Sequence, residues 1–303
     1  MSEMTVFQQK MTAALPHIEY RFDEPMSRHT SFRIGGPAEV MAFPKSADEL
    51  AKLLKMSAFL DCKTAIIGAG TNILAPDEGI EGLVICLKDC LTGMEQIDST
   101  HIRVAAGVSM ARAAVFAAGL NLGGLEFAHG IPGTVGGGVY MNAGAYGGEI
   151  KDVCQSVSVM YPDGSVVEYS AEEMEFSYRH SRLEKENGIV ISAVFTLTPK
   201  PEAEVREQMQ ELFQKRKTSQ PLELPSAGSA FKRPVGGYAA ALIDQVGLKG
   251  FTVGGAQVST KHAGFVVNVG GATAKDVEEL LKQVAEKVME HSGIALEPEI
   301  RIW

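Results

Sequence analysis

The sequence of 303 residues predicts an α+β protein in which a large mixed part is followed by a smaller α/β lobe. Three observations support this fold class. Short strand patterns dominate from Gly82 to Leu197, Pro199-Lys200-Pro201 breaks the chain, and helical periodicity follows the break. We therefore place a lobe boundary at the two prolines.

The residue pattern near the N-terminus predicts a βαβ unit over residues 39–68. A helical segment occupies the first twenty residues, and a strand follows from Glu39 to Lys45. Ser46 with Glu49 three residues later is a capping-box pattern that starts a helix. One face of this helix is marked by apolar side chains, namely Leu50, Leu53, Leu54 and Ala58. The apolar run Thr64–Gly68 completes the unit as a buried strand.

The middle of the chain predicts strands around one short helix. Strands are expected at Gly82–Leu87, His101–Ala106 and Ile189–Leu197. Ser109 is placed to cap a helix that runs from Met110 to Ala118 and ends at Gly119. Pro162-Asp163-Gly164 between Val157–Tyr161 and Val166–Tyr169 is a strong hairpin signal.

The C-terminal lobe predicts three helices and two strands. The first helix covers Glu202–Lys217, with four apolar residues expected inward, namely Val205, Met209, Leu212 and Phe213. A second helix covers Tyr238–Val246, and strands cover Gly264–Val269 and Leu296–Trp303. Thr273 and Gly293 bracket an amphipathic helix. Its apolar face comprises Val277, Leu280, Leu281, Val284, Val288 and Met289.

Composition and charge exclude several classes of function. The formal net charge of −9 disfavours nonspecific binding to nucleic acid or to an anionic membrane, which requires a basic face. No apolar run reaches the roughly 20 residues of a membrane span, and residues 1–17 lack the pattern of a secretion signal. The four cysteines have no metal-site spacing, so we expect reduced thiols, no metal and a cytoplasmic protein.

Two glycine-rich segments are the strongest sign of a ligand. Gly130–Glu149 contains eight glycines in twenty residues and has no helical or strand period, which predicts a loop. Its backbone N–H groups would then wrap an anionic or flat ligand, although tight turns without a ligand remain an alternative. Gly68–Asn72 forms a second loop at the carboxyl end of a predicted strand, where ligands tend to bind. It does not match GxGxxG, which disfavours a Rossmann fold.

Four other segments carry groups that could bind an anion. Tyr178–Arg182 holds two arginines and a histidine, and Ser226–Pro234 places Ser229 on a turn near Lys232. The first segment could equally be a surface turn. For the second, a loop that binds an anion is favoured over a surface turn, and Ser229 lacks the GxSxG context of a hydrolase. Lys261-His262 could contact a phosphate or form an ordinary polar turn. Strand alternation places Glu297, Glu299 and Arg301 on one face of the last strand.

Seven ordered motifs identify the chain as similar to one family. They are TSFRIGGPAE (30–39), IIGAGTNIL (66–74), GIPGTVGGGVYMNAGAYGGEI (130–150), YRHSRL (178–183), AGSAFKRP (227–234), KHAGFVVN (261–268) and LEPEIRIW (296–303). Together they resemble the UDP-N-acetylenolpyruvoylglucosamine reductase (MurB) family of bacterial peptidoglycan synthesis.

The resemblance implies a two-lobed FAD domain of the PCMH/vanillyl-alcohol-oxidase type and a substrate lobe. The implied boundaries are residues 1–82 and 83–200 for the two FAD lobes and 201–295 for the substrate lobe, with strand 296–303 returning to the first lobe. FAD would bind noncovalently. Its pyrophosphate would lie on the segment Ile67, Gly68, Ala69, Gly70, Thr71, Asn72 and Ile73, near Arg33, Gly35 and Gly36. Its other groups would contact Gly130, Ile131, Pro132, Gly133, Thr134, Gly137, Gly138 and Asn142.

The resemblance also implies the reaction and its residues. NADPH would reduce FAD, and reduced FAD would pass the hydride to UDP-N-acetylglucosamine enolpyruvate in a monomeric enzyme. Ser229 matches the proton donor, Arg179 the carboxylate-stabilising arginine, and Glu299 a glutamate with a raised pKa that donates to the enediolate. Glu297 is the alternative for the last position. Substrate binding would involve Tyr178, Lys232, Lys261 and His262.

Two departures from the family and two competing functions remain. No inserted tyrosine loop lies between Arg179 and Ser229, so the chain resembles the shorter class of the family and how its site closes stays open. Arg233 replaces an asparagine of some members, which leaves that diphosphate contact open. The alternatives are a flavin oxidase of the same fold, which would react readily with oxygen, and a colourless nucleotide- or UDP-sugar-binding protein.

Overall fold

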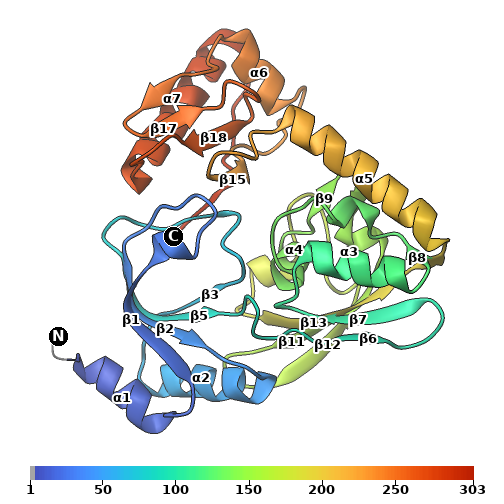
Figure 1. The fold of residues 1–303 in the computed structure, drawn as a ribbon. Helices are drawn as coiled ribbons and strands as arrows, with labels where there is room; N and C mark the ends of the chain where they lie inside the picture. Colours follow the sequence, from blue (N-terminus) through green and yellow to red (C-terminus); the bar gives the residue numbers. More distant parts are fainter. Residues whose placement is uncertain (1–3) are drawn as a thin grey trace. The chain divides into compact units, whose positions relative to one another are not determined.

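The computed structural model describes residues 4–303, which form two compact units (Figure 1). Unit 1 contains residues 4–22, 39–69 and 81–215, and unit 2 contains Asp23–Ala38, Gly70–Ile80 and Arg216–Trp303. Residues 23–38 and 70–80 are thus grouped with the C-terminal part, whereas the predicted lobes placed them in the first. The reason is long-range pairing, for example between β4 (Ile73–Leu74) and β19 (Arg301–Ile302).

Unit 1 begins with a helix and a four-stranded sheet. Helix α1 (Val6–Ala14) lies within the predicted N-terminal helical segment, whose first three residues lie outside the described ones. The strand order is β1 (Glu19–Pro25), β2 (Pro37–Phe43), β5 (Ile80–Cys86), β3 (Thr64–Ile67). Helix α2 (Ala47–Phe59) is capped by Ser46 as predicted. Its last inward residue is Ser57 and not the predicted Ala58, which is exposed. β3 and β5 are parallel.

A five-stranded antiparallel sheet forms the rest of unit 1. Its order is β12 (Val166–Ser170), β11 (Cys154–Met160), β13 (Ile189–Thr196), β7 (His101–Ala105), β6 (Met94–Gln96). The predicted hairpin around Pro162-Asp163-Gly164 is confirmed by the β11–β12 pairing. Helices α3 (Met110–Gly119) and α4 (Val135–Tyr140) belong to the same unit, as does most of α5 (Glu202–Ser219). Two short strand pairs complete it, β8 (Leu122–Gly123) with β14 (Thr198–Pro199) and β9 (Gly144–Ala145) with β10 (Gly148–Glu149).

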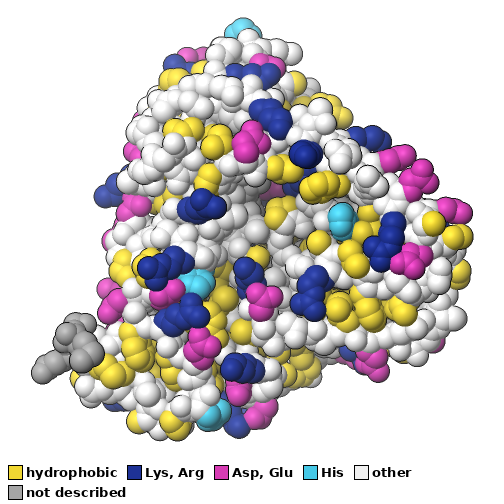
Figure 2. Space-filling model, viewed as in Figure 1, with side chains coloured by type: hydrophobic (Ala, Val, Ile, Leu, Met, Phe, Trp, Pro, Cys, Tyr) yellow, Lys and Arg dark blue, Asp and Glu magenta, His cyan; other side chains and the backbone are white. Residues whose placement is uncertain are grey.

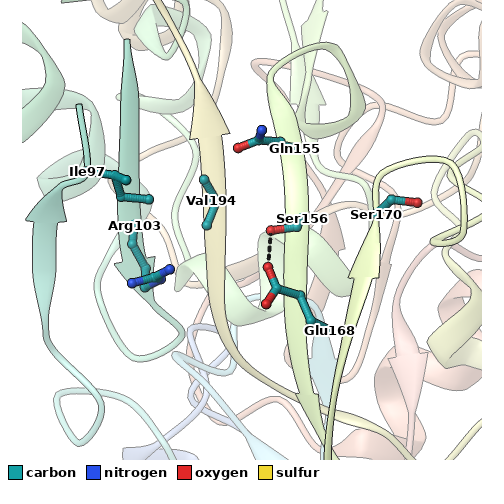
Figure 3. A pocket seen from close by; sticks show the side chains of 7 residues that line it. All are labelled: Ile97, Arg103, Gln155, Ser156, Glu168, Ser170 and Val194. Carbon is teal, nitrogen blue, oxygen red and sulfur yellow. Dashed lines mark hydrogen bonds between the residues drawn. The ribbon is translucent and has the colours of Figure 1, made fainter. Parts of the chain in front are cut away.

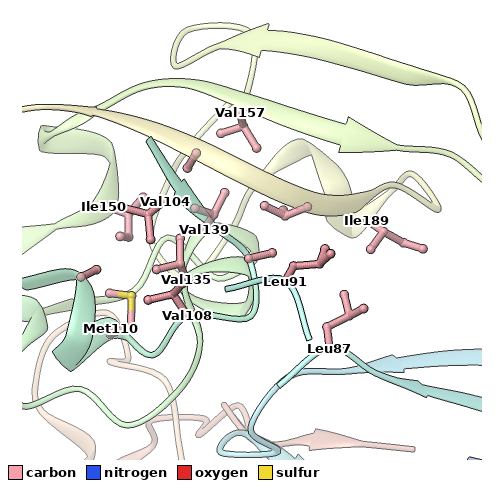
Figure 4. Packing of buried hydrophobic residues seen from close by; sticks show 14 of the residues in the cluster. Leu87, Leu91, Val104, Val108, Met110, Val135, Val139, Ile150, Val157 and Ile189 are labelled. Carbon is pink, nitrogen blue, oxygen red and sulfur yellow. The ribbon is translucent and has the colours of Figure 1, made fainter. Parts of the chain in front are cut away.

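Part of the core of unit 1 lies between this sheet and the helices α3 and α4 (Figure 4), and the same cluster extends to buried residues of α2 and β5. Val157 of β11 and Val104 of β7 pair with the same residue of β13, Ala193, and all three side chains are fully buried. Val135 and Val139 of α4 are also fully buried and belong to this cluster. Because alternate strand residues face opposite sides, the other face of the sheet carries polar side chains.

Unit 2 is a smaller α/β arrangement. Its four-stranded sheet has the order β15 (Ser226–Ser229), β18 (Phe265–Asn268), β17 (Ala256–Val258), β16 (Thr252–Val253). Helices α6 (Ala239–Gln245) and α7 (Ala274–Ser292) pack with it around one apolar cluster. Thr273 and Gly293 end α7 as predicted, and Gly293 has a φ of +69°.

Three predictions about these elements are wrong. Phe213 of α5 and Met289 of α7 are exposed, because each lies at the edge of its helix's apolar stripe. Only Arg301–Ile302 of the predicted strand 296–303 forms a strand, since Pro298 has no N–H group for a ladder. Four single-turn 3-10 helices, Met26–Arg28, Glu126–Ala128, Ile150–Asp152 and Arg182–Glu184, connect the described elements.

Candidate active site

The two glycine-rich segments are in contact within unit 1. β3 ends at buried Ile67, whose carbonyl accepts a hydrogen bond from Leu87 N (2.8 Å). The next residue, Gly68, packs so closely on Thr134 that an added Cβ would lie 2.4 Å from Thr134 Oγ1. A glycine is therefore required at position 68 for this approach, and the two segments predicted to hold the cofactor are neighbours.

The remainder of the first loop folds against Ser31–Gly36 in unit 2. Ser31 N donates to Gly70 O (3.0 Å), and a Cβ on Gly70 would lie 2.1 Å from His29 O. Arg33 and Gly70 both adopt left-handed backbone angles, with φ of +55° and +61°. Gly35 also requires glycine, since its φ is +129° and its Cβ would lie 2.6 Å from Ala75 Cβ. The structure thus brings together the residues predicted around the pyrophosphate in this unit.

The second glycine segment contains a helix, contrary to the prediction of a loop. Thr134 caps α4, and Gly136, Gly137 and Gly138 all lie inside the helix. A Cβ on Gly136 would lie 2.9 Å from Ala106 Cβ, and one on Gly138 would lie 2.7 Å from Met110 Sδ. Two of the three glycines thus let α4 approach β7 and α3 closely. A Cβ on Gly137 would meet only Thr134 Oγ1, at 3.7 Å, so this position leaves room beside the helix.

Arg179 occupies the tip of a tight turn in unit 1. Ser177 and His180 exchange backbone hydrogen bonds of 3.1 Å, and Arg179 between them has a φ of +55°. Its guanidinium donates to Gly144 O (3.4 Å) and lies 5.1 Å from the ring centre of Tyr178. The ring of Tyr178 is exposed, whereas His180 pairs with Glu184. The guanidinium of Arg179 is thus held against the glycine-rich segment, whereas His180 pairs with a residue close to it in the sequence.

Ser229 and Glu299 are brought together in unit 2. Ser229 ends β15 after Gly228, whose φ is +82°, and it pairs with Phe265 of β18. The next residue, Ala230, accepts a hydrogen bond at its carbonyl from Glu299 N (2.9 Å). Both Ser229 and Glu299 are partly buried. Ser229 and Glu299, which are 70 positions apart in the sequence, are therefore brought near each other by one backbone hydrogen bond at Ala230.

Asn72 ties the first glycine loop to the same place. Its side chain donates to Glu299 O (3.1 Å), and its carbonyl accepts from Arg301 N (3.0 Å). A residue predicted to hold the cofactor and a residue predicted to be catalytic are therefore joined by one hydrogen bond within unit 2.

The two candidate glutamates differ in exposure. The carboxylate of Glu297 is 71% exposed and forms an ion pair with Lys232, and its carbonyl accepts from Lys232 N (2.8 Å). Glu299 is less exposed and follows an isolated antiparallel bridge between Phe231 and Pro298. The expected strand alternation does not apply here, because the regular strand begins only at Arg301.

Lys261 and His262 lie in a turn of unit 2 and contact protein groups. Lys261 Nζ donates to Lys217 O (2.8 Å), and the ring of His262 packs edge-on against Phe265 with centres 5.1 Å apart. His262 Nδ1 accepts from Gly264 N (3.1 Å). Burial lowers the pKa of His262 below its usual value of 6.5, because the charged ring would lose solvation. Both side chains thus have partners inside the protein.

Two buried polar side chains near Arg179 have roles that the sequence did not reveal. Asn142, which was predicted to contact the cofactor, is fully buried, and its amide hydrogen-bonds to protein groups. Ser181 is also fully buried, and its hydroxyl donates to Tyr140 O (2.7 Å). Ser181 lies in the YRHSRL motif, yet nothing in the motif itself shows which hydroxyl points inward.

The remaining surface features lie apart from these residues. A hollow on the outer face of the five-stranded sheet is lined by polar and apolar side chains, and Ser156 Oγ donates to Glu168 Oε1 (2.7 Å) in it (Figure 3). Its lining includes none of the predicted site residues. On the face shown in Figure 2, basic side chains are scattered among acidic ones. An anionic ligand on this face would therefore meet individual cations.

Among residues 4–303, no helix is long and apolar enough to cross a membrane. No group of three or more His, Cys, Asp or Glu side chains in this part of the chain could hold a metal ion.

Models of two protein domains match the chain, one in its N-terminal part and one in its C-terminal part. An FAD binding domain matches residues 38–170, and the C-terminal domain of UDP-N-acetylenolpyruvoylglucosamine reductase matches residues 220–303. The first match contains Gly68, Thr134 and Asn142, and the second contains Ser229 and Glu299. The predicted fold class, a vanillyl-alcohol-oxidase-type FAD domain with a smaller α/β domain, is confirmed.

Relatives match over almost the entire chain. A UDP-N-acetylenolpyruvoylglucosamine reductase of Agathobacter rectalis is 48% identical, covering 98% of each chain. One of Syntrophomonas wolfei is 44% identical over 95% of this chain and 96% of its own. The crystal structure of the Thermus caldophilus enzyme is similar with a TM-score of 0.79 and 36% identity, covering 95% of this chain and 99% of that one. An alkyldihydroxyacetonephosphate synthase, 16% identical over 65% of this chain and 41% of its own, has a TM-score of 0.50 and shares the fold alone.

Proposed function

Because this chain belongs to the UDP-N-acetylenolpyruvoylglucosamine reductase family, we propose that Arg179, Ser229 and Glu299 perform the proton transfer and charge stabilisation of its reaction. The chain is an FAD-dependent oxidoreductase that reduces the enolpyruvyl group of UDP-N-acetylglucosamine enolpyruvate in peptidoglycan synthesis. The observation that supports these roles is the hydrogen bond from Glu299 N to the carbonyl of Ala230, the residue that follows Ser229 (2.9 Å).

The glycine-rich segments fit a flat, doubly phosphorylated cofactor. Gly68 and Thr134 bring the two segments into contact, and Gly137 leaves space where any side chain would project. Backbone at Ile67–Asn72 with Arg33 and Gly35 would hold the pyrophosphate, while Gly130–Thr134 with Gly137 and Gly138 would line the rest. FAD bound there would supply the hydride, with NADPH as its source.

The reaction needs a proton and a means to hold negative charge. Hydride addition to the terminal alkene carbon leaves an enediolate that extends into the substrate carboxylate. The guanidinium of Arg179 would bind this carboxylate, since arginine offers two parallel N–H donors. The Ser229 hydroxyl would then deliver a proton to the carbon that bears the ether oxygen, and Glu299, protonated, would donate to the enediolate oxygen.

The diphosphate and sugar would meet a few individually placed side chains. Lys232 follows Ser229 by three residues and forms an ion pair with Glu297, and we propose that its ammonium contacts the diphosphate. Tyr178 presents an exposed ring next to Arg179. Lys261 and His262 complete the proposed set, His262 through its effect on the turn that carries Lys261.

Ser229→Ala tests the assignment by separating the two half-reactions. We expect reduction of the bound FAD by NADPH to change less than about twofold, and reduction of the enolpyruvyl sugar to fall by about 10²- to 10⁴-fold, the range of general acid catalysis. Both rates are measured by anaerobic stopped-flow absorbance of the flavin. Ser226→Ala, on the same strand, is the matched control and should leave both rates unchanged. Retention of the sugar rate in Ser229→Ala would show that another group donates the proton.

Oligomeric state and compartment belong to the same proposal. The four cysteines are free thiols, which suits the reducing cytoplasm. We propose a cytoplasmic monomer, and light scattering of the FAD-loaded protein across a tenfold concentration range would reveal any dimer.

A further inference from the structure

The turn that carries Arg179 is attached on both sides to the C-terminal end of α4. On one side, Asn142 Nδ2 donates to Ser177 O (2.9 Å). On the other side, the Ser181 hydroxyl donates to Tyr140 O (2.7 Å). Ser177 and His180 close the turn between these two attachments. The position of the turn is therefore set by Tyr140, the last residue of α4, and by Asn142, two residues beyond it.

Asn142 is built into this place by its backbone and its amide together. Its φ of +42° is left-handed, which asparagine tolerates better than most residues. The same amide donates to Glu149 Oε2 (2.8 Å) and accepts from Lys151 N (2.9 Å). With the bond to Ser177 O, one fully buried side chain therefore joins three segments of unit 1.

The turn needs such support because its tip is strained. Arg179 has a φ of +55°, a conformation that costs free energy in any residue other than glycine. Its guanidinium reaches Gly144 O (3.4 Å), two residues beyond Asn142. The glycine-rich segment thus contacts the turn at its base through Asn142 and at its tip through Gly144.

We propose that Asn142 is a positioning residue that holds Arg179 in register with the glycine-rich segment. This inference rests on the proposed role of Arg179 in binding the substrate carboxylate. The carboxylate must meet the guanidinium at hydrogen-bond distance while the alkene carbon lies over the cofactor. A misplacement of about 1 Å in such a site costs on the order of 10²-fold in rate. Asn142 links the turn of Arg179 to the glycine-rich segment directly, because its amide is hydrogen-bonded to Ser177 O in the turn and its backbone belongs to that segment.

The sequence offers well-matched variants for a test. Asn142→Gly removes the amide and keeps the left-handed backbone without strain. Asn142→Asp keeps the acceptor for Lys151 N and loses both donors, so it serves the same test if the glycine variant does not fold. Asn121→Gly is the control, because Asn121 is also left-handed (φ +58°) and its Oδ1 accepts from Glu202 N (3.1 Å).

The experiment is a double-variant cycle with Arg179→Ala, with both half-reactions followed in FAD-saturated protein. We expect Asn142→Gly to slow reduction of the sugar about 10- to 100-fold and to leave reduction by NADPH within about twofold. In the Arg179→Ala background, Asn142→Gly should cause no further loss, because the group that it positions is gone. Asn121→Gly should change neither rate.

Three results would overturn the inference, and they are distinguishable. Equal slowing of both half-reactions by Asn142→Gly would show a general structural role. The same fold-loss in the presence and absence of Arg179 would show that Asn142 acts independently of it. If Arg179→Ala itself leaves sugar reduction intact, the proposed role of Arg179 fails and the inference fails with it.

Discussion

Gly68→Ala tests the contact between the two cofactor segments. The new methyl group would lie 2.4 Å from Thr134 Oγ1, whereas ordinary contacts begin near 3.4 Å. The two atoms must therefore separate by about 1 Å, a shift that overpacked sites resist. Gly68 is not in the left-handed region, so the alanine backbone itself adds no strain at this position.

Two responses are open to the protein, and each has a cost. Displacement of the loop costs about 1–3 kcal/mol, as in other overpacked sites. Rotation of Thr134 instead loses its cap on α4, a bond to Gly137 N that is long at 3.5 Å, for about 0.5–1 kcal/mol. The protein should adopt the response that costs less, which is rotation of Thr134. We therefore expect a loss of about 1 kcal/mol in the free energy of unfolding, together with weaker FAD binding.

A cycle with Thr134 isolates the clash. In a Thr134→Ala background the Oγ1 atom is absent, and the threonine Cβ lies at an ordinary 3.5 Å, so Gly68→Ala should be nearly neutral. Thr134→Ser is the control, because it keeps the hydroxyl and should restore most of the cost. Stability is measured by urea unfolding of the protein without FAD, and affinity by quenching of flavin fluorescence. The same cost in all three backgrounds would refute the contact as its cause.

Two further predictions follow from the geometry. Glu299→Gln should slow sugar reduction by at least about tenfold. Glu297→Gln alters an exposed ion pair and should change the same rate less than about threefold. The stopped-flow assay compares the two variants, and equal effects would contradict the choice of Glu299. For His262, burial lowers the folded pKa below its usual 6.5, so the unfolded state binds more protons and the free energy of unfolding falls as pH drops below about 6.5. His262→Asn can still accept from Gly264 N but does not titrate, so urea unfolding between pH 5 and 8 should show a shallower slope; an unchanged slope would assign the pH dependence elsewhere.

Local signals predicted the regular elements well. Ser109 and Thr273 start their helices, Gly293 ends α7, and Pro162-Asp163-Gly164 joins β11 to β12. Each of these signals acts through hydrogen bonds or backbone angles within a few residues, so the sequence itself contains the information. The same locality explains the errors at Phe213 and Met289, since periodicity shows which residues could face inward but not how wide the buried stripe is.

The candidate site was predicted in its residues but not in its contacts. The ordered motifs pointed to Arg179, Ser229 and Glu299, yet alternation could not separate Glu299 from Glu297. In the structure the carboxylate of Glu297 is exposed and pairs with Lys232, a residue 65 positions away in the sequence. Such a partner is chosen by how the chain returns, which no local pattern encodes.

Composition by itself determined that Gly130–Glu149 is a segment where backbone is closely approached, because only glycine permits that approach. The tertiary structure decided what does the approaching. Ala106 and Met110 pack against Gly136 and Gly138, Thr134 packs against Gly68, and Gly137 alone of the triplet leaves open space. These glycines cannot be told apart in the sequence. In the folded chain Gly68, Gly136 and Gly138 each meet a close neighbour from another part of the chain, whereas Gly137 meets none closer than 3.7 Å.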